Sequence, residues 1–474
     1  MNHPEQYRGR QVVVLGLAKS GVEVAKILHH YGAIVTVNDR KTREESPEAS
    51  ELEALGISVV CGGHPDGLIS PSVELVVKNP GIPYSAPPVV KALELGIDVV
   101  TEVEVAYHLS KAPIIGITGS NGKTTTTTWI GKLLEAAGLQ PIVAGNIGTP
   151  LCVAAESAEA ENWLVAELSS FQLKGTQDFR PKVGVLLNIA ETHLDYHGSM
   201  DDYIASKVKL FANQTSSDIA IVNWDDPVCR QLVSHLKARP IPFSMTEELT
   251  EEGVFVTPAF ISGVEDERER TIVYRDSEGK LHSIIAVHDI GLPGRFNVGN
   301  ALAAVAACIA AGAPCEPLAE PLRTFRGVEH RLEFVEVKHD VTYYNNSKAT
   351  NGKATMMALG ALNQPIVLIA GGLDRGSDYM ELLPAFKEKV KAVVALGQTK
   401  EKIAKVAELA GLSDIAIVDT VDSAADTLRN AITQAAEFAK PGDIVLLSPA
   451  CASWDMFKSY EERGRIFKEA VHTL

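Results

Sequence analysis

Short runs of β-branched and other apolar residues alternate along the chain with segments whose apolar positions recur every three or four residues. The first pattern predicts buried strands and the second predicts helices that cover a sheet. A first group of strands is expected at residues 11–16, 33–39 and 75–81, and a second at 113–119, 163–169, 183–189 and 219–226. This repeated strand and helix order indicates parallel sheets of the α/β class.

The pattern changes between residues 254 and 290, where apolar runs are separated by Gly, Asp and Ser turns. This spacing predicts a small antiparallel insertion. The segment "NVGNALAAVAACIAAG" follows and predicts a buried Ala-rich helix. A third group of strands is expected near 366–370, 392–396, 415–418 and 443–447.

The three groups of strands predict three domains, in keeping with roughly 150 residues for each domain. We expect a Rossmann-like domain over residues 1–110 and a central domain, with a parallel sheet and the antiparallel insertion, over 111–327. A second Rossmann-like α/β domain is expected over 328–474.

The charge and the cysteines limit the class of protein. The chain has 474 residues and a formal net charge of −16 at pH 7, which argues against a nucleic-acid partner, because phosphate-backbone binding needs clustered Lys and Arg. The six cysteines form no CxxC pair, which predicts reduced and mostly buried thiols. Without a signal-peptide pattern or an apolar stretch of membrane-spanning length, we expect a cytoplasmic protein that does not insert into membranes, and a monomer.

The first strand leads into "VVVLGLAKSG", with Gly16 at its end, Gly21 in the next turn and Asp39 closing the second strand, as in a Rossmann opening. The glycine that lets the backbone approach a dinucleotide pyrophosphate is replaced by Ala18. Three interpretations stay open: a mononucleotide-like ligand with its phosphates on the helix N-terminus, NAD, and a plain strand-to-helix turn.

The segment "PIIGITGSNGKTT" is more specific. Ile117 stands where a strict Walker A motif needs its first glycine, but a strand, a glycine-rich turn, Lys123, Thr124 and a helix still follow in that order. Backbone N–H groups and the lysine can then surround a triphosphate, and Thr124 can bind Mg²⁺. The central domain is therefore predicted to be of the phosphate-loop ATPase type.

Two further side chains are expected beside this loop. Glu167 ends an apolar strand, where a charge is costly unless it is paired or binds a cation. His193 follows the next strand, at the carboxyl edge where α/β sheets bind ligands. Both are candidate metal ligands, whereas His197 is expected at the surface.

The third domain carries "HRLE", "YYNNSKATN", "GGLDRGSD" and "LLSPACASWDMFKSYEERG" next to its strands. These segments concentrate small polar and basic residues and predict one binding edge, although turns favour the same residue types.

The segments "GITGSNGKTT", "GNIGTP", "ELSSFQL", "THLDYH" and "NVGNALAA", together with "HRLE", "NNSKATN" and "SPACASWDMFKSYEERG", resemble the Mur ligases, the ATP-dependent amide-forming enzymes of peptidoglycan precursor synthesis. The resemblance covers all three domains. It implies an ATP-dependent ligase that adds D-glutamate to UDP-N-acetylmuramoyl-L-alanine through an acyl phosphate, with two Mg²⁺ ions. Charge neutralisation at the transferring phosphoryl group is then the main task of the protein.

The resemblance also implies roles for individual residues. Catalysis and metal binding would involve Lys123, Thr124, Glu167, His193, Arg331 and Lys207, the last as a carbamate. The nucleotide would contact Gly119, Ser120, Asn121, Gly122, Lys123, Thr124, Thr125, Asn297, Asn300, His330, Arg331 and Asn346. The UDP substrate would contact Lys19, Ser20, Asn38, Asp39, Arg40, Asn146, Ser169, Gln172 and His193, and D-glutamate would contact Thr350, Arg375, Ser453 and Tyr460.

Three positions depart from the family pattern. Asn346 stands where Asp is expected, so its contact to a ribose would lack charge. Arg375 and Tyr460 stand where the family often has Lys and Phe. An arginine can grip a side-chain carboxylate through two hydrogen bonds, which suits an acidic amino acid.

Other functions remain to be separated from this one. A relative that adds another amino acid, or an enzyme like folylpolyglutamate synthase, would share the central domain. An NAD-dependent dehydrogenase built on "GLAKSG" would leave Lys123 without a role. A phosphate-loop switch that binds partners would form no amide product.

Overall fold

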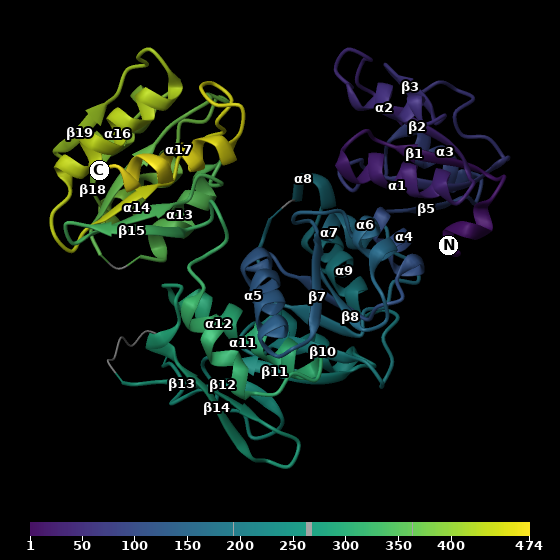
Figure 1. Ribbon diagram of the computed structural model, residues 1–474, viewed down its shortest axis with the longest axis horizontal. Helices are drawn as coiled ribbons and strands as arrows, with labels where there is room; N and C mark the ends of the chain where they lie inside the picture. Colours follow the sequence, from purple (N-terminus) through teal and green to yellow (C-terminus); the bar gives the residue numbers. More distant parts are fainter. Residues whose placement is uncertain (193, 262–267, 363) are drawn as a thin grey trace. The chain divides into compact units, whose positions relative to one another are not determined.

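The computed structural model describes residues 1–192, 194–261, 268–362 and 364–474, and it has the mixed α/β fold that the sequence predicts, with one sheet in each of three domains (Figure 1). The first two domains form one compact unit, and the third forms a second unit together with residues 291–297. In the described part of the chain, no helix has the length and apolarity needed to span a bilayer.

The N-terminal sheet is fully parallel, with its first strand in the middle, in the order β3-β2-β1-β4-β5. Its strands are β1 (Gln11–Leu15), β2 (Ile34–Asp39), β3 (Ser58–Cys61), β4 (Val73–Lys78) and β5 (Asp98–Val100). The associated helices are α1 (Lys19–His30), α2 (Glu48–Ala54), α3 (Pro87–Glu94) and α4 (Glu102–Leu109). The sequence patterns did not predict the short strands β3 and β5.

The central sheet has nine strands in the order β14-β13-β12-β11-β10-β9-β6-β8-β7. They are β6 (Ile114–Thr118), β7 (Gln140–Gly145), β8 (Asn162–Glu167), β9 (Val183–Leu186), β10 (Ile219–Asn223), β11 (Arg239–Ser244), β12 (Gly253–Thr257), β13 (Thr271–Arg275) and β14 (Leu281–Ala286). The last three are antiparallel to one another, as predicted, but β12 pairs parallel with β11. The predicted insertion is therefore a continuation of the central sheet.

The helices of this domain are α5 (Lys123–Ala136), α6 (Leu151–Ser157), α7 (Ser170–Lys174), α8 (Leu194–His197), α9 (Met200–Val208), α10 (Pro227–Leu232), α11 (Arg295–Ala310) and α12 (Ala319–Thr324). The predicted Ala-rich helix is α11, and its residues from Ala301 to Cys308 are fully buried. One continuous apolar core includes residues of both the first and the second domain, which explains why these two domains form one unit.

The C-terminal sheet has the order β15-β16-β20-β17-β18-β19, and all of its pairs are parallel except β15 with β16. Its strands are β15 (Glu333–Lys338), β16 (Val341–Asn345), β17 (Ile366–Ala370), β18 (Val390–Ala395), β19 (Asp414–Ile417) and β20 (Ile444–Leu447). Its helices are α13 (Gly352–Gly360), α14 (Leu383–Lys389), α15 (Lys400–Leu409), α16 (Ala424–Phe438) and α17 (Tyr460–His472).

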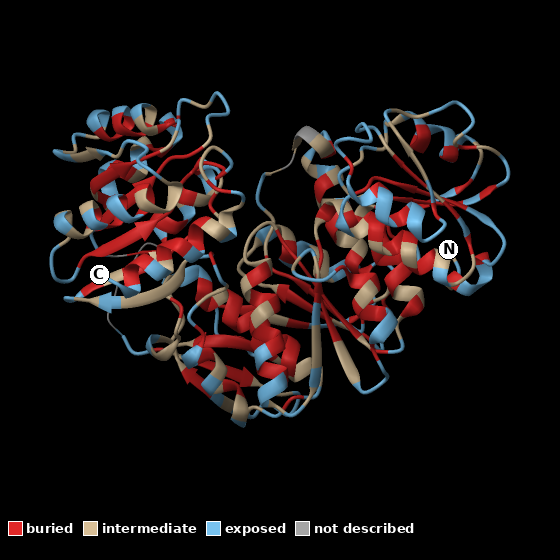
Figure 2. Cartoon of the chain, turned by 45° about the horizontal axis from the view of Figure 1, so that its top comes forward, coloured by how far each residue is buried: buried red, intermediate tan, exposed pale blue. Residues whose placement is uncertain are grey.

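Buried residues gather on the strands of the sheets (Figure 2). The six cysteines are free thiols and four of them are buried, as the sequence predicts.

Candidate active site

The loop between β6 and α5 has the backbone of a phosphate-binding turn. Gly122 precedes the first residue of α5 with a φ of 83°, a conformation that glycine adopts at little cost. A Cβ atom at this position would lie 2.2 Å from Oδ1 of Asn300. Two residues predicted to contact the nucleotide, Gly122 and Asn300, therefore lie against each other.

The loop is held from the side by the end of β9. The Ser120 N–H donates to the Asn188 carbonyl at 3.0 Å, and the Asn121 N–H donates to the Asn188 side chain at 2.9 Å. Ser120 Oγ also lies 2.8 Å from the hydroxyl of Tyr203 in α9. These bonds fix the loop before any ligand is considered, which is what a preorganised site needs.

Two lysines meet at this loop. Lys123 Nζ donates to the carbonyls of Gly119 at 2.8 Å and Ser120 at 3.0 Å, and Lys207 Nζ donates to the same Gly119 carbonyl at 2.8 Å. Lys207 is 1% exposed, and its burial, followed by the nearby charge of Lys123, lowers its pKa to about 6. At neutral pH Lys207 is thus mainly a neutral amine, the form that can react as a nucleophile.

The site offers oxygen ligands for a divalent cation. Glu167 ends β8 beside Ile117 of β6 and is 2% exposed. One carboxylate oxygen accepts from Asn146 Nδ2 at 3.0 Å, and the other has no hydrogen-bond partner among the described residues. Thr124 is buried in the first turn of α5. A buried carboxylate oxygen with no partner fits a metal ligand, because such a group is otherwise costly.

The sequence predicts a metal ligand at His193 and a surface residue at His197. His193 lies outside the described residues, so its predicted metal role stays a prediction. The expectation that His197 is a surface residue is wrong: it is 6% exposed and bonded to Ser170 and Asp202. Local sequence gave no sign of this burial, because the partners come from α7 and α9.

Two of the predicted UDP-substrate residues of the central domain, Ser169 and Gln172, lie at the N-terminal end of α7. Ser169 and Gln172 form a capping box, in which each side chain accepts from the backbone N–H of the other. Gln172 also lies 3.5 Å from the buried carboxylate of Glu102. These residues brace the helix N-terminus, and Asn146 is held by Glu167.

The predicted residues of the first domain surround the turn after β1. Lys19 is exposed and its Nζ donates to the Gly148 carbonyl at 2.8 Å, while Arg40 is also exposed. Asp39 accepts one N–H on each carboxylate oxygen, from Leu17 at 2.8 Å and Lys41 at 2.9 Å. Ser20 accepts from Asn79 Nδ2 at 3.4 Å, a neighbour that the sequence did not point to.

Asn38 is 1% exposed, unlike the other predicted residues at this turn. Its amide nitrogen donates to the carbonyls of Val60 at 2.9 Å and Gly63 at 2.7 Å, and its oxygen lies 2.6 Å from His64 Nδ1. Both amide donors are therefore used inside the protein.

In the other compact unit, His330 is buried and its Nδ1 lies 2.9 Å from Asn345 Nδ2, while Arg331 is exposed. Burial lowers the pKa of His330, although nearby glutamates oppose this effect. Asn346 uses its amide in both directions: it accepts from the Leu332 N–H at 3.1 Å and donates to Ser448 Oγ at 3.0 Å. Asn297 donates to the Pro293 carbonyl at 2.6 Å.

The predicted amino-acid residues lie on loops of this unit. Arg375 is exposed, with its guanidinium 5.1 Å from the ring centre of Trp454, and Ser453 is buried. Thr350 is half-buried, and Tyr460, the first residue of α17, has its pKa raised to about 12 by burial and by its bond to Glu461.

Arg463, which no sequence pattern singled out, holds two of these loops together. Its guanidinium donates to Ser347 Oγ at 3.0 Å, to the Ser347 carbonyl at 2.9 Å and to the Cys451 carbonyl at 3.1 Å. Burial lowers its pKa to about 10. The motif "SYEERG" contains this arginine, but nothing in its spacing distinguishes it from a surface residue.

Comparisons with known proteins agree with this arrangement. The Mur ligase MurD-like N-terminal domain matches residues 10–101, the Mur ligase middle domain 117–308, and the glutamate ligase domain of Mur ligases 330–451. Relatives from Geobacillus sp. (strain WCH70) and Geobacillus kaustophilus (strain HTA426), both named UDP-N-acetylmuramoylalanine–D-glutamate ligase, are 50% identical over 469 residues, covering 99% of this chain and 98% of each relative. A relative of the same name from Bacillus cereus (strain ATCC 14579) is 46% identical, with 99% of both chains covered.

Solved structures share the fold at low sequence identity. The UDP-N-acetylmuramate–alanine ligase MurC of Thermotoga maritima matches with a TM-score of 0.58 and 19% identity, over 98% of this chain and 99% of that one. The MurF ligase of Thermotoga maritima, solved in complex with ADP, matches with a TM-score of 0.54 and 17% identity, over 100% and 97% of the two chains. From its relatives at 50% identity over nearly its full length, this chain belongs to the Mur ligase family.

Proposed function

We propose that this chain is an ATP-dependent amide-bond-forming ligase that joins D-glutamate to UDP-N-acetylmuramoyl-L-alanine in peptidoglycan precursor synthesis. The observation that carries the proposal is the cluster at the phosphate loop, where Lys123 and Lys207 share the Gly119 carbonyl and Glu167 ends the neighbouring strand. The name shared by the most similar curated relatives supports the choice of substrates.

The proposed reaction has two steps. A carboxylate oxygen of the UDP substrate attacks the γ-phosphorus of ATP, the bond to the bridging oxygen breaks, and ADP leaves. The amine of D-glutamate then attacks the acyl carbon, phosphate leaves, and the nitrogen loses a proton. Most of the catalytic demand is charge stabilisation at the transferring group.

The residues of the loop are suited to the first step. Lys123 would supply positive charge beside the β- and γ-phosphates. Thr124 and Glu167 would hold a magnesium ion, which would neutralise phosphate oxygens during transfer. A second ion is proposed at His193 and at Lys207 in its carbamate form, for which the neutral amine of Lys207 is the required precursor.

The remaining contacts are proposed from the family resemblance. Asn297, His330, Arg331 and Asn346 are proposed to bind the nucleotide, together with Asn300. Thr350, Arg375, Ser453 and Tyr460 are proposed to bind D-glutamate, with Arg375 opposite the side-chain carboxylate.

The test measures phosphate release and amide product in one mixture of ATP, Mg²⁺, UDP-N-acetylmuramoyl-L-alanine and one amino acid. The panel contains D-glutamate, L-glutamate, D-aspartate, L-alanine and meso-diaminopimelate. We expect phosphate release only when both the UDP substrate and D-glutamate are present, with one amide formed for each ATP consumed. Preference for the diamino acid, or phosphate release without either substrate, would contradict the proposal.

A further inference from the structure

His197 lies at the centre of a buried hydrogen-bonded group that joins α7 to α9. Its Nε2 is 3.0 Å from Oγ of Ser170, the first residue of α7, and its Nδ1 is 2.8 Å from Oδ2 of Asp202 in α9. The side chain of His197 has no exposed surface. With Asp202 accepting from Nδ1–H, Nε2 is the acceptor for the Ser170 hydroxyl, so a neutral imidazole satisfies both neighbours.

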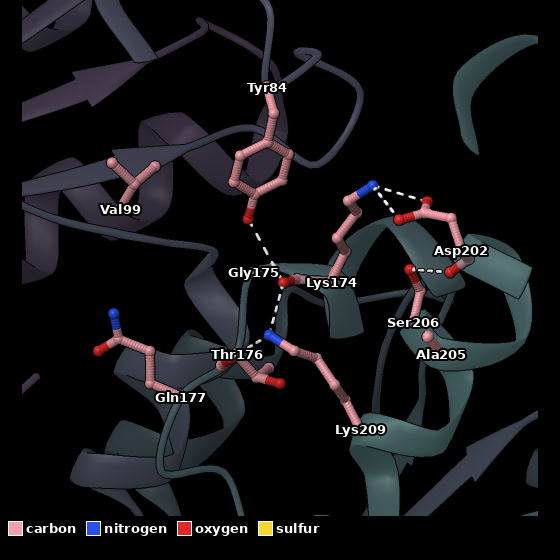
Figure 3. Close-up of a pocket in the computed structure, with 10 residues that line it drawn as sticks. All are labelled: Tyr84, Val99, Lys174, Gly175, Thr176, Gln177, Asp202, Ala205, Ser206 and Lys209. Carbon is pink, nitrogen blue, oxygen red and sulfur yellow. Dashed lines mark hydrogen bonds and ion pairs between the residues drawn. The ribbon is translucent and has the colours of Figure 1, made fainter. Parts of the chain in front are cut away.

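Asp202 holds the other end of α7 as well. Lys174, the last residue of α7, donates to both carboxylate oxygens of Asp202 at 2.8 and 2.7 Å, and Ser206 donates to the Asp202 carbonyl at 2.7 Å (Figure 3). Asp202 thus binds the C-terminal end of α7 directly and its N-terminal end through His197. Both ends of this five-residue helix are therefore bonded to α9.

The two helices joined in this way carry the proposed reaction site. Ser169, a predicted contact of the UDP substrate, immediately precedes α7, and Lys207 is in α9. The His197 ring also packs against Tyr203, with 5.3 Å between ring centres, and the Tyr203 hydroxyl lies 2.8 Å from Ser120 in the phosphate loop. A shift of α7 against α9 would therefore change the separation of Ser169 from Lys207.

Ser170, His197 and Asp202 have the order of side chains found in serine hydrolases, but they cannot act in that way. Ser170 is 2% and His197 6% exposed, so a substrate carbonyl cannot reach the serine oxygen. The arrangement orients helices and does not itself react.

We propose that His197 is a positioning residue for phosphoryl transfer, which bridges Ser170 and Asp202 and thereby holds Ser169 and Lys207 at the spacing that the reaction needs. This inference rests on the proposed function. It assigns a task to a histidine that touches no substrate, in the way that residues behind metal ligands and catalytic groups set their geometry.

Two substitutions, His197→Asn and Ser170→Ala, each remove the hydrogen bond between Ser170 and His197. His197→Asn keeps an amide near the position of Nδ1, facing Asp202, but it cannot reach Ser170, and Ser170→Ala removes the hydroxyl. We expect each variant to lower kcat by about 10–100-fold, the range typical of residues that set the geometry of a site from behind it. The KM for D-glutamate should stay constant, because its proposed contacts lie in the other compact unit.

The double variant provides the sharper measurement. Because both changes remove one interaction, His197→Asn with Ser170→Ala should have the kcat of His197→Asn alone. The control is His288→Asn, at a histidine whose side chain is 64% exposed, which should keep the wild-type kcat. Circular dichroism and the melting midpoint of each variant separate folding from catalysis, and Ser170→Ala carries the test if His197→Asn does not fold.

The outcomes are distinct. A wild-type kcat in folded His197→Asn or Ser170→Ala, or a lowered melting midpoint with unchanged kcat well below it, would overturn the positioning role. The positioning role would also be overturned if the fold-loss in kcat of the double variant equalled the product of the two single fold-losses, since the two residues would then act independently. A wild-type protein that forms no amide with any amino acid of the panel would instead refute the proposed function.

Discussion

Replacing Lys207 by methionine should stabilise the protein while it abolishes amide formation. Lys207 is almost fully buried, and its pKa of about 6 lies far below the ordinary value of 10.5. Folded chains therefore hold it unprotonated above pH 6, whereas unfolded chains keep it protonated up to about pH 10.4. Unfolding takes up a proton across this window, so the stability of the wild-type protein rises with pH.

The size of the effect follows from these values. At pH 7 the difference between the pH and the unfolded pKa is about 3.5 units, and at about 1.4 kcal/mol for each unit the upper limit is roughly 5 kcal/mol. Methionine loses the bond from Nζ to the Gly119 carbonyl, which offsets about 1 kcal/mol. We expect a net gain of about 2–4 kcal/mol at pH 7, shrinking to less than about 1 kcal/mol at pH 9.5.

The assay is urea unfolding of wild type and Lys207→Met at several pH values, in buffer without Mg²⁺ or bicarbonate. Tryptophan fluorescence reports mainly on the central domain, which contains three of the four tryptophans, Trp129, Trp163 and Trp224. Lys111→Met is the matched control, because the Lys111 side chain is 66% exposed and its replacement removes no buried charge. Equal or lower stability of Lys207→Met at pH 7, or a gain that does not shrink as the pH rises, would refute the reasoning.

Three other predictions concern the same structure. Gly122→Ala places a Cβ 2.2 Å from Asn300 Oδ1 at a φ of 83°, so it should cost about 1–3 kcal/mol of stability and remove the thermal shift that ATP produces; an unchanged shift would contradict the phosphate-loop role. Glu167→Gln keeps an oxygen that can accept from Asn146 but loses the negative charge. We expect kcat to fall about 100-fold and the Mg²⁺ concentration needed for half-maximal activity to rise, both measured by Mg²⁺ titrations of phosphate release, while stability stays unchanged or increases. Gly21→Ala places a Cβ 2.1 Å from the Gly16 carbonyl and should lower the melting midpoint by several degrees, whereas Gly360→Ala, at a helix position with no atom within 4 Å, should not lower it.

Most of the fold could be predicted from apolar patterns, because long buried strands such as Ile366–Ala370 form continuous apolar runs. The strand β11 was missed because "RPIPFS" contains two prolines, which argue against a central strand. Arg239 donates its N–H to the Asp218 carbonyl on the side of β10, so the alternating Pro240 and Pro242 point their nitrogens towards β12. Pairing with β12 begins only at Phe243, so neither proline removes a hydrogen bond of the ladder.

The site was less accessible to sequence reasoning than the fold. Turn glycines and strand-end residues such as Gly122 and Glu167 carry local signals, since their chemistry depends on neighbours in the chain. The buried positions of Lys207, His197 and Arg463 depend on partners that lie in other helices, strands or loops, so local patterns treat them as ordinary helix or loop residues. For Lys207 the family resemblance, and not the pattern of its helix, indicated a role.

The carboxylate of Asp39 carries a consequence for how such turns are classified. An acid at the end of the second strand is widely taken as a mark of ribose recognition in nucleotide enzymes. Here the Asp39 carboxylate accepts hydrogen bonds from the N–H groups of Leu17 and Lys41. These bonds stabilise the turns after β1 and β2 with or without a bound ligand. If the UDP substrate binds at this edge as predicted, exposed cations such as Lys19 and Arg40 would have to supply the selectivity, and the acid alone would not identify the cofactor.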